Sequence, residues 1–145
     1  MAERPQNYST HRRFFPLFHF VVLPIMLLNF LNSLRHVWMM PNRSTAWAAV
    51  VAFGLAALAL SARVMALAVQ DRVIRLEMQL RLARVLPANL QGRIAALERG
   101  HFVALRFASD EELPGLVQEV TDGKLQSANE IKKRVKNWQA DWLRA

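Results

Sequence analysis

The hydrophobic residues of this chain are concentrated in its first half. Two apolar stretches, 14–34 and 46–62, are separated by a short polar segment, and the second continues into a helical pattern without a Gly or Pro. An α-helix rises about 1.5 Å per residue, so about 20 apolar residues cross the roughly 30 Å hydrocarbon core of a bilayer. The pattern therefore predicts transmembrane helices at 14–34 and 46–69, joined by a short external loop at 35–45.

A cleaved signal peptide is the alternative for the first stretch. Arg12 and Arg13 resemble a positively charged n-region, but the apolar run is longer than the hydrophobic region of a signal peptide, which has about 7–15 residues, and no small-residue cleavage site follows it. We therefore favour a membrane helix. Pro24 predicts a kink in the middle of that helix, because proline has no N–H to donate to the preceding turn.

Alanines recur along the second stretch at helical spacing. Ala49, Ala52, Ala56 and Ala59 are separated by three or four residues, and Ala48 begins a small-xxx-small row with two of them. Small side chains let helix backbones approach closely in lipid. We expect this face to pack against the first helix of the same hairpin, with a dimer interface as the alternative.

The arginines predict the orientation. Positive charge near membrane ends stays on the cytoplasmic side. The external loop holds Arg35 and Arg43, whereas the segments flanking the hairpin are richer in arginine, so both termini should be cytoplasmic. Trp38 and Trp47 would form an aromatic belt at the outer interface. The residues expected at the lipid headgroups are Arg12, Arg13, Arg63, Arg72 and Arg75.

An amphipathic stalk helix is predicted over 70–86. Its apolar positions recur at alternating spacings of four and three residues, at Val69, Val73, Leu76, Leu80 and Ala83, with Ile74, Met78 and Val85 widening the stripe. The stripe is too short for a coiled coil of three or four heptads. We expect it to pack on the C-terminal helices of its own chain. Val73, Leu76 and Leu80 are the alternative contact for a partner.

Favourable ion pairs along this helix would join Asp71 to Arg75 and Glu77 to Arg81, each four residues apart. Pro87 should end the helix, because the residue before a proline is disfavoured in the α conformation. The stalk would then lead directly into a separate C-terminal domain.

Residues 87–145 predict a small cytoplasmic domain of three or four short helices. One helix should run from Pro87 to Gly100, and another should cover 101–108. Capping boxes at Ser109–Glu112 and Ser127–Glu130 predict two further helix starts. The last helix would turn Trp138, and with it Trp142, toward the core. No alternating β pattern of useful length occurs, so the fold class is all-α.

A polar face on the first transmembrane helix is the clearest alternative site. Asn29, Asn32 and His36 share one side of that helix, because three and seven residues return to nearly the same azimuth. We favour an interhelical hydrogen-bonding role for them. A substrate path is the alternative, and it would make the protein an oligomeric transport or sensing subunit.

Composition excludes several function classes. The chain has 53% apolar residues, 19 Lys+Arg against 11 Asp+Glu, and no cysteine, so neither disulfides nor thiolate metal ligands are available. His11 and His19 lie on either side of Pro16 and do not form a helical ligand pair. No catalytic triad, phosphate loop or nucleophile elbow is present, so we expect no enzyme, no metal and no cofactor.

The basic excess also raises the possibility of nucleic-acid binding through 132–136. No nucleic-acid fold signature accompanies these charges. A solvated helix face explains them better, and the juxtamembrane arginines fit anionic lipid headgroups. A membrane-tethered nucleic-acid-binding protein is therefore the weakest of the alternatives.

The chain resembles an uncharacterised bacterial family of small two-span membrane proteins, a family of unknown function. The stretches that carry the resemblance are QNY at 6–8 with His11, PLFHF at 16–20, QDRVIRLE at 70–77, LARVLP at 82–87, ALRFASDEELP at 104–114, and the lysine-rich segment 131–138. The resemblance touches nearly the whole chain. It implies an integral protein of the bacterial inner membrane and supplies no activity, substrate or catalytic residue.

These inferences together predict a membrane-anchored interaction or adaptor module. Segment 1–13 would be cytoplasmic, the hairpin would hold the chain in the bilayer, and 87–145 would be presented in the cytoplasm. Besides the lipid bilayer, the expected partner is another protein or a second copy of this chain.

Overall fold

The computed structural model describes residues 7–8 and 15–141. Within these residues all the regular secondary structure is helical, which confirms the all-α prediction. The chain forms two compact units, a hairpin unit that extends to Ala68 and a C-terminal unit that begins at Val69.

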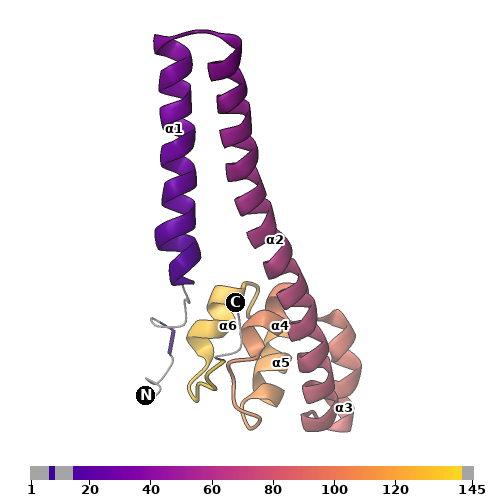
Figure 1. Ribbon diagram of the computed structural model, residues 1–145. Helices are drawn as coiled ribbons and strands as arrows, with labels where there is room; N and C mark the ends of the chain where they lie inside the picture. The colour runs from indigo at the N-terminus through magenta and orange to yellow at the C-terminus, as the bar shows by residue number, and fades with distance from the viewer. Residues whose placement is uncertain (1–6, 9–14, 142–145) are drawn as a thin grey trace. The chain divides into compact units, whose positions relative to one another are not determined.

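The hairpin unit contains the first long helical stretch and the N-terminal part of the second. A π-helix, η1 (Leu17–Val22), leads directly into α1 (Leu23–Met39). After a short turn, the 43-residue α2 (Arg43–Val85) begins and runs back beside α1, as Figure 1 shows. In the turn, Thr45 donates its backbone N–H to the Asn42 side-chain oxygen at 2.9 Å and its hydroxyl to the Met40 carbonyl at 2.9 Å.

The helix is irregular just before Pro24, the residue at which a kink was predicted. Pro24 occupies the first turn of α1, where a missing N–H is tolerated. The residues before it form η1, in which the Leu23 N–H donates to the Phe18 carbonyl. A π-helical turn replaces the i→i−4 hydrogen bonds of an α-helix with i→i−5 bonds, so it changes the hydrogen-bonding register next to the proline.

The alanine-rich face of α2 packs on α1, as predicted. Ala52 is 2% exposed, and Phe53 lies with its ring centroid 5.8 Å from that of Phe30. One small apolar cavity within the hairpin is lined by residues of both helices: Leu23, Met26, Leu27, Phe30, Ala56, Ala59 and Leu60. Ala48, in contrast, is exposed.

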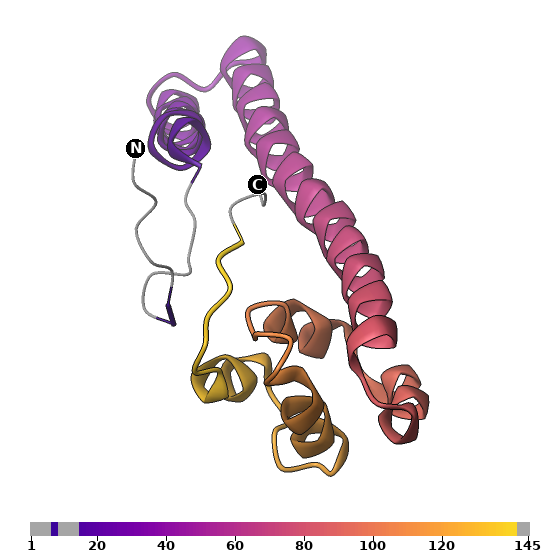
Figure 2. The ribbon, with the colours of Figure 1, turned by 90° about the horizontal axis from the view of Figure 1, so that it is seen from below.

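The C-terminal unit packs short helices around the last turns of α2. These are α3 (Ala88–Gln91), the 3₁₀ helix η2 (Gly92–Ala96), α4 (Arg99–Leu105), α5 (Leu113–Thr121) and α6 (Ala128–Arg134). Figure 2 shows α4, α5 and α6 gathered beside one another, with α4 in contact with both of the others. The side chains with no exposed surface at the centre include Leu82, Phe102, Leu105, Phe107, Leu113, Val117 and Ile131.

The face of α2 in this core includes only the edge of the predicted stripe: Ile74 and Met78, which widened that stripe, are buried together with Leu82. Ile74, Met78 and Leu82 are 5%, 3% and 0% exposed, whereas Leu76 and Leu80 are 61% and 75% exposed. Both sets are apolar and recur at helical spacing. The core helices α4–α6 cover the first set, so the predicted contact of the other stripe with the C-terminal helices is wrong.

Two predicted helices are shorter than expected. The helix predicted from Pro87 to Gly100 breaks after Ala96, and Gly100 lies inside α4 instead of ending a helix. The last helix ends at Arg134, because Val135 has an extended backbone with ψ 125°. Trp138 therefore reaches the core from a non-helical segment, 4.9 Å from the Phe107 ring, and Trp142 lies outside the described residues.

Only one of the two predicted capping boxes forms. The Ser127 hydroxyl accepts the Glu130 N–H at 3.2 Å, and the Glu130 carboxylate accepts the Ser127 N–H at 3.3 Å. Ser109 does not cap a helix, since α5 begins only at Leu113, with Pro114 in its first turn. At the other end of α5, Gly123 has φ +77°, the left-handed conformation that ends a helix.

Candidate interaction surface

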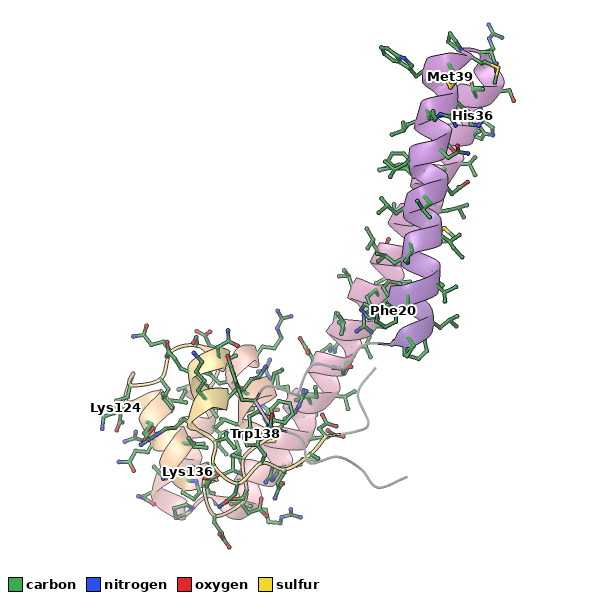
Figure 3. All side chains as sticks on the ribbon, turned by 90° about the vertical axis from the view of Figure 1, so that its left-hand side faces the viewer. Phe20, His36, Met39, Lys124, Lys136 and Trp138 are labelled. Carbon is green, nitrogen blue, oxygen red and sulfur yellow. The ribbon has the colours of Figure 1, made fainter. Side chains whose placement is uncertain are left out.

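The two longest helical stretches are each long and apolar enough to cross a membrane. Leu17–Met39 has a mean hydropathy of 1.9 and Arg43–Val85 of 2.1 in their most apolar windows. Large apolar side chains point outward along both, among them Phe20, Leu28, Phe53 and Leu58 at 60–67% exposure. Figure 3 shows Phe20 and Met39 near opposite ends of the first helical stretch, with side chains projecting outward between them.

The C-terminal end of α2 carries a second exposed apolar surface. We call Val69, Val73, Leu76, Leu80 and Ala83 the α2 stripe. Its four large members are 61%, 48%, 61% and 75% exposed in chain order, and Ala83 is also exposed. Exposed apolar residues scattered singly are ordinary, but a contiguous row of them marks an interaction surface.

The α2 stripe lies opposite the buried face of the same helix. Successive helical residues are about 100° apart, which places Val73 and Leu80 roughly 180° from Met78 and Leu82. Ile74, Met78 and Leu82 pack in the core of the C-terminal unit and are at most 5% exposed. The stripe is consequently turned away from the domain core and fixed in that direction.

Charged residues border the α2 stripe on both sides. Arg72 lies on one flank and Glu77 and Arg84 lie on the other, and all three are exposed. The ion pairs predicted along the helix are replaced by longer-range ones. The Asp71 carboxylate is 3.8 Å from the Arg99 guanidinium instead of pairing with Arg75, and Arg81 pairs with Asp110 instead of Glu77.

Arg81 holds α2 to the α4–α5 connection. Its Nε lies 2.7 Å from the Asp110 carboxylate, and its terminal nitrogens donate to the carbonyls of Arg106 at 3.2 Å and Ala108 at 2.8 Å. A further bond of 2.8 Å reaches the Gln139 side-chain oxygen. A guanidinium that satisfies several acceptors at once fixes an orientation. Arg81 is therefore a structural clamp and not a lipid-facing charge.

The acidic cluster at 110–112 takes part in the same tertiary network. Besides the pairing of Asp110, the Glu112 carboxylate accepts the backbone N–H groups of Lys136 and Asn137, both at 3.1 Å. These bonds tie the segment after α6 to the start of α5. The interpretation of this cluster as helix capping is wrong, and the available signal was Pro114, because proline favours the first helical turn.

A buried arginine, Arg106, lies against Phe107, the same ring that Trp138 contacts. Arg106 is 8% exposed, and its Nε lies 3.1 Å from the Asp141 carboxylate. Its guanidinium also stacks over the Phe107 ring, 4.5 Å from the centroid. Burial of a charge is tolerated where it is paired in this way. Nothing in the spacing along the sequence indicated the pairing.

Two carboxylates of the C-terminal unit are held in their charged form. The side-chain hydrogen bond from Arg134, whose nitrogens lie 3.0–3.1 Å away, lowers the pKa of Glu119. Hydrogen bonds from the backbone N–H groups of Gln126 and Ser127 lower the pKa of Glu130. Both carboxylates stabilise contacts of α6, one with α5 and the other with its own N-terminus. Lys124 and Lys136 point outward from the unit (Figure 3).

The other predicted site residues fall on the surface of the described chain. Trp38 and Trp47 are 89% and 68% exposed. Asn29 and Asn32 are exposed and His36 is half-buried, so neither asparagine is enclosed between α1 and α2. The arginines predicted to lie at lipid headgroups divide into three groups. Arg72 and Arg75 are exposed, Arg63 lies over the Phe18 ring at 6.0 Å, and Arg12 and Arg13 lie outside the described residues.

No set of three or more His, Asp or Glu side chains in residues 7–8 and 15–141 is placed to hold a metal ion. The surface with the clearest capacity for binding is thus the α2 stripe. It can bury apolar side chains against a partner, with charges of both signs at its edges.

A family model named "Family of unknown function (DUF6526)" matches residues 1–145. The chain belongs to this family. No match to the chain was found among curated proteins or among solved structures. Membership of the DUF6526 family agrees with the predicted resemblance to a family of unknown function, and it assigns no activity to the α2 stripe.

Proposed function

We propose that this chain is an integral protein of the bacterial inner membrane that presents a helical interaction module in the cytoplasm. The hairpin of α1 and the first part of α2 would span the bilayer, with both termini inside. The exposed α2 stripe would be the contact surface for another protein. The single observation that carries this proposal is the exposure of Val73, Leu76 and Leu80 on a helix whose other face is firmly buried.

The membrane part of the proposal is supported by the surface of the hairpin. Leu28 and Leu58 are both 65% exposed on helices with enough apolar length to cross a bilayer. In water such a surface would favour aggregation, whereas lipid tails cover it without cost. The arginine distribution supports the orientation, because Arg72, Arg75, Arg81 and Arg84 follow the second candidate span closely.

Cysteine labelling tests the topology, since the natural chain has no cysteine. We expect Asn42→Cys, in the turn between the helices, to react with a membrane-impermeant maleimide in intact cells. Gln91→Cys, exposed in α3, should react only after the membrane is opened. Reaction of both sites in intact cells, or recovery of the protein in the soluble fraction, would contradict the proposal.

In-cell photocrosslinking tests the contact surface. A photoreactive residue in place of Leu76 should give a reproducible protein adduct in native membranes, because that side chain is 61% exposed on the α2 stripe. The same residue at Gln91 is the control, exposed but outside the stripe. Adducts with lipid alone at position 76 would contradict an interaction module.

A second candidate function rests on the polar face of α1. Asn29 and Asn32 are exposed in a segment with the composition of a membrane span, and polar groups in lipid normally find partners. An oligomeric transport or sensing subunit would enclose them between chains. Replacing both with leucine should then abolish oligomers in membranes, and unchanged oligomers would count against this candidate.

A further inference from the structure

We infer that the partner of the α2 stripe is a second copy of this chain, joined in a parallel, in-register coiled coil. The inference rests on the proposed function, because the hairpin would anchor both copies from the same side of one membrane. Its basis is the register of apolar and charged residues on the exposed face of α2.

The α2 stripe follows heptad spacing. Assigning Val73 and Leu80 to position a places Val69, Leu76 and Ala83 at position d. A β-branched residue at a with leucine at d favours two parallel strands, and Val73 with Leu76 supplies that combination. All five side chains are exposed, so they are available to a facing helix.

The flanking charges fit a parallel partner. In the same register Arg72 occupies position g and Glu77 occupies position e. A parallel dimer sets each g residue against the e residue five positions further along the partner, which brings Arg72 of one copy to Glu77 of the other. Symmetry forms this pair twice. The exposed Arg84, also at position e, faces Gln79 across the dimer and meets no like charge.

The register also continues toward the hairpin. The a and d positions next before Val69 along the seam are Ala66 and Ala62, and both are exposed on α2. Small side chains permit the close backbone approach that holds helices together in lipid. A helix pair joined at Val73 and Leu76 would therefore meet only small side chains at these two positions.

Association requires little further ordering. The α2 stripe belongs to a continuous helix already fixed on its other side by Leu82 and Met78. Preorganisation reduces the entropic cost of binding, and confinement to one membrane raises the effective concentration of the second copy. This is how so short a seam can pair stably.

An anionic membrane surface fits the same residues less well. A lipid-facing flank would carry positive charge throughout, and Glu77 places a negative charge beside Leu76 and Leu80. A dimer gives Glu77 an ion-pair partner instead, which is Arg72 of the second copy.

Disulfide crosslinking of the full chain in native membranes tests the seam. Val73→Cys and Leu80→Cys are separated by one heptad, and in a parallel dimer both should form disulfide-linked dimers under mild oxidation. Arg75→Cys, exposed on the same helix but away from the stripe, is the matched control. A dimer through only one of the two stripe positions, or equal crosslinking of the control, would overturn the parallel register.

Charge exchange separates self-association from other contacts. Arg72→Glu alone and Glu77→Arg alone should each lower crosslinking through Leu80→Cys, by roughly fivefold, because two exposed pairs are replaced by like charges. The double exchange should restore it. If Glu77→Arg strengthens crosslinking, or the double variant stays as weak as the singles, the Arg72–Glu77 pairing is wrong.

The photocrosslinker at Leu76 distinguishes this inference from the function on which it rests. An adduct at twice the mass of the chain supports the dimer. An adduct with a different protein overturns the dimer while leaving the interaction module intact. Lipid adducts alone overturn both.

Discussion

The hairpin unit and the C-terminal unit use apolar residues in opposite ways. In the hairpin, Leu28 and Leu58 are 65% exposed and the small Ala52 is the buried contact. In the C-terminal unit, Leu82, Phe102 and Phe107 have no exposed surface. The first pattern suits a solvent of lipid tails and the second suits water.

The long helix α2 belongs to both patterns, and the comparison is sharpest there. Leu80 and Leu82 are two residues apart, yet one is 75% exposed and the other 0%. The same residue type thus has two roles on one helix, depending on which side it occupies. Four predictions test this contrast, from the largest expected effect to the smallest.

The largest effect is expected at Leu82. Leu82→Ala removes a fully buried side chain and should lower the free energy of unfolding of the C-terminal unit by about 2–5 kcal/mol. Leu80→Ala is the control. It should change the free energy of unfolding by less than about 0.5 kcal/mol when the protein is kept monomeric by dilution in detergent. Hydrogen exchange of α4 and α5 amides measures both. Equal losses of protection would show that the two faces of α2 are not distinct.

A charge in the hairpin should be the next most costly change. Leu58→Arg places a guanidinium at the centre of the second candidate span and should oppose membrane insertion by roughly 3 kcal/mol. Leu80→Arg is equally exposed but lies outside the hairpin, so insertion should be unchanged. The membrane-bound fraction after carbonate extraction checks both. Normal insertion of Leu58→Arg would remove the distinction between the two units.

A smaller loss is expected when Arg81 is truncated. Arg81→Ala leaves the carbonyls of Arg106 and Ala108 without their donor and should cost about 1–3 kcal/mol in the C-terminal unit. The exposed Arg84, three residues away, is the control, and Arg84→Ala should stay within about 0.5 kcal/mol. Thermal melting of the detergent-solubilised protein compares them. If Arg84→Ala were the more destabilising change, Arg81 would not be the clamp.

The smallest effect concerns Glu130 and pH. Backbone hydrogen bonds lower the pKa of Glu130 in the folded chain, so its stabilising contribution is present above the pKa of the unfolded chain. That contribution is lost as the pH falls through the folded-state pKa. Glu130→Gln should therefore melt below the natural protein at pH 7, and the difference should disappear at acidic pH. A constant difference at all pH values would contradict this role.

Local signals predicted much of the secondary structure. Pro87 ends α2, Gly123 ends α5, and the Ser127–Glu130 capping box begins α6. Each of these depends on residues within one or two helical turns, so the sequence contains the whole interaction. Helix ends that depend on distant groups were predicted poorly. Ser109 does not begin a helix, because Asp110 and Glu112 bond to α2 and to the segment after α6.

The residues of the candidate site were predicted from the sequence, but the contacts that surround them were not. Val73, Leu76 and Leu80 were recognised as an apolar row, yet their side of the helix was assigned to the core. Arg81 was predicted to pair with Glu77 on the same helix, whereas it binds the α4–α5 connection. In both cases the deciding contacts are many residues away along the chain.

The sequence alone therefore determined that the chain is helical, where α2 and α5 end, where α6 begins, and which two stretches are apolar enough to span a membrane, since these follow from local hydrogen bonding and apolar length. Tertiary structure decided which face of α2 is buried. A helix with 3.6 residues per turn can carry apolar rows on two opposite sides, and its own periodicity cannot choose between them. Packing of α4–α6 on Ile74, Met78 and Leu82 made that choice and left the α2 stripe exposed.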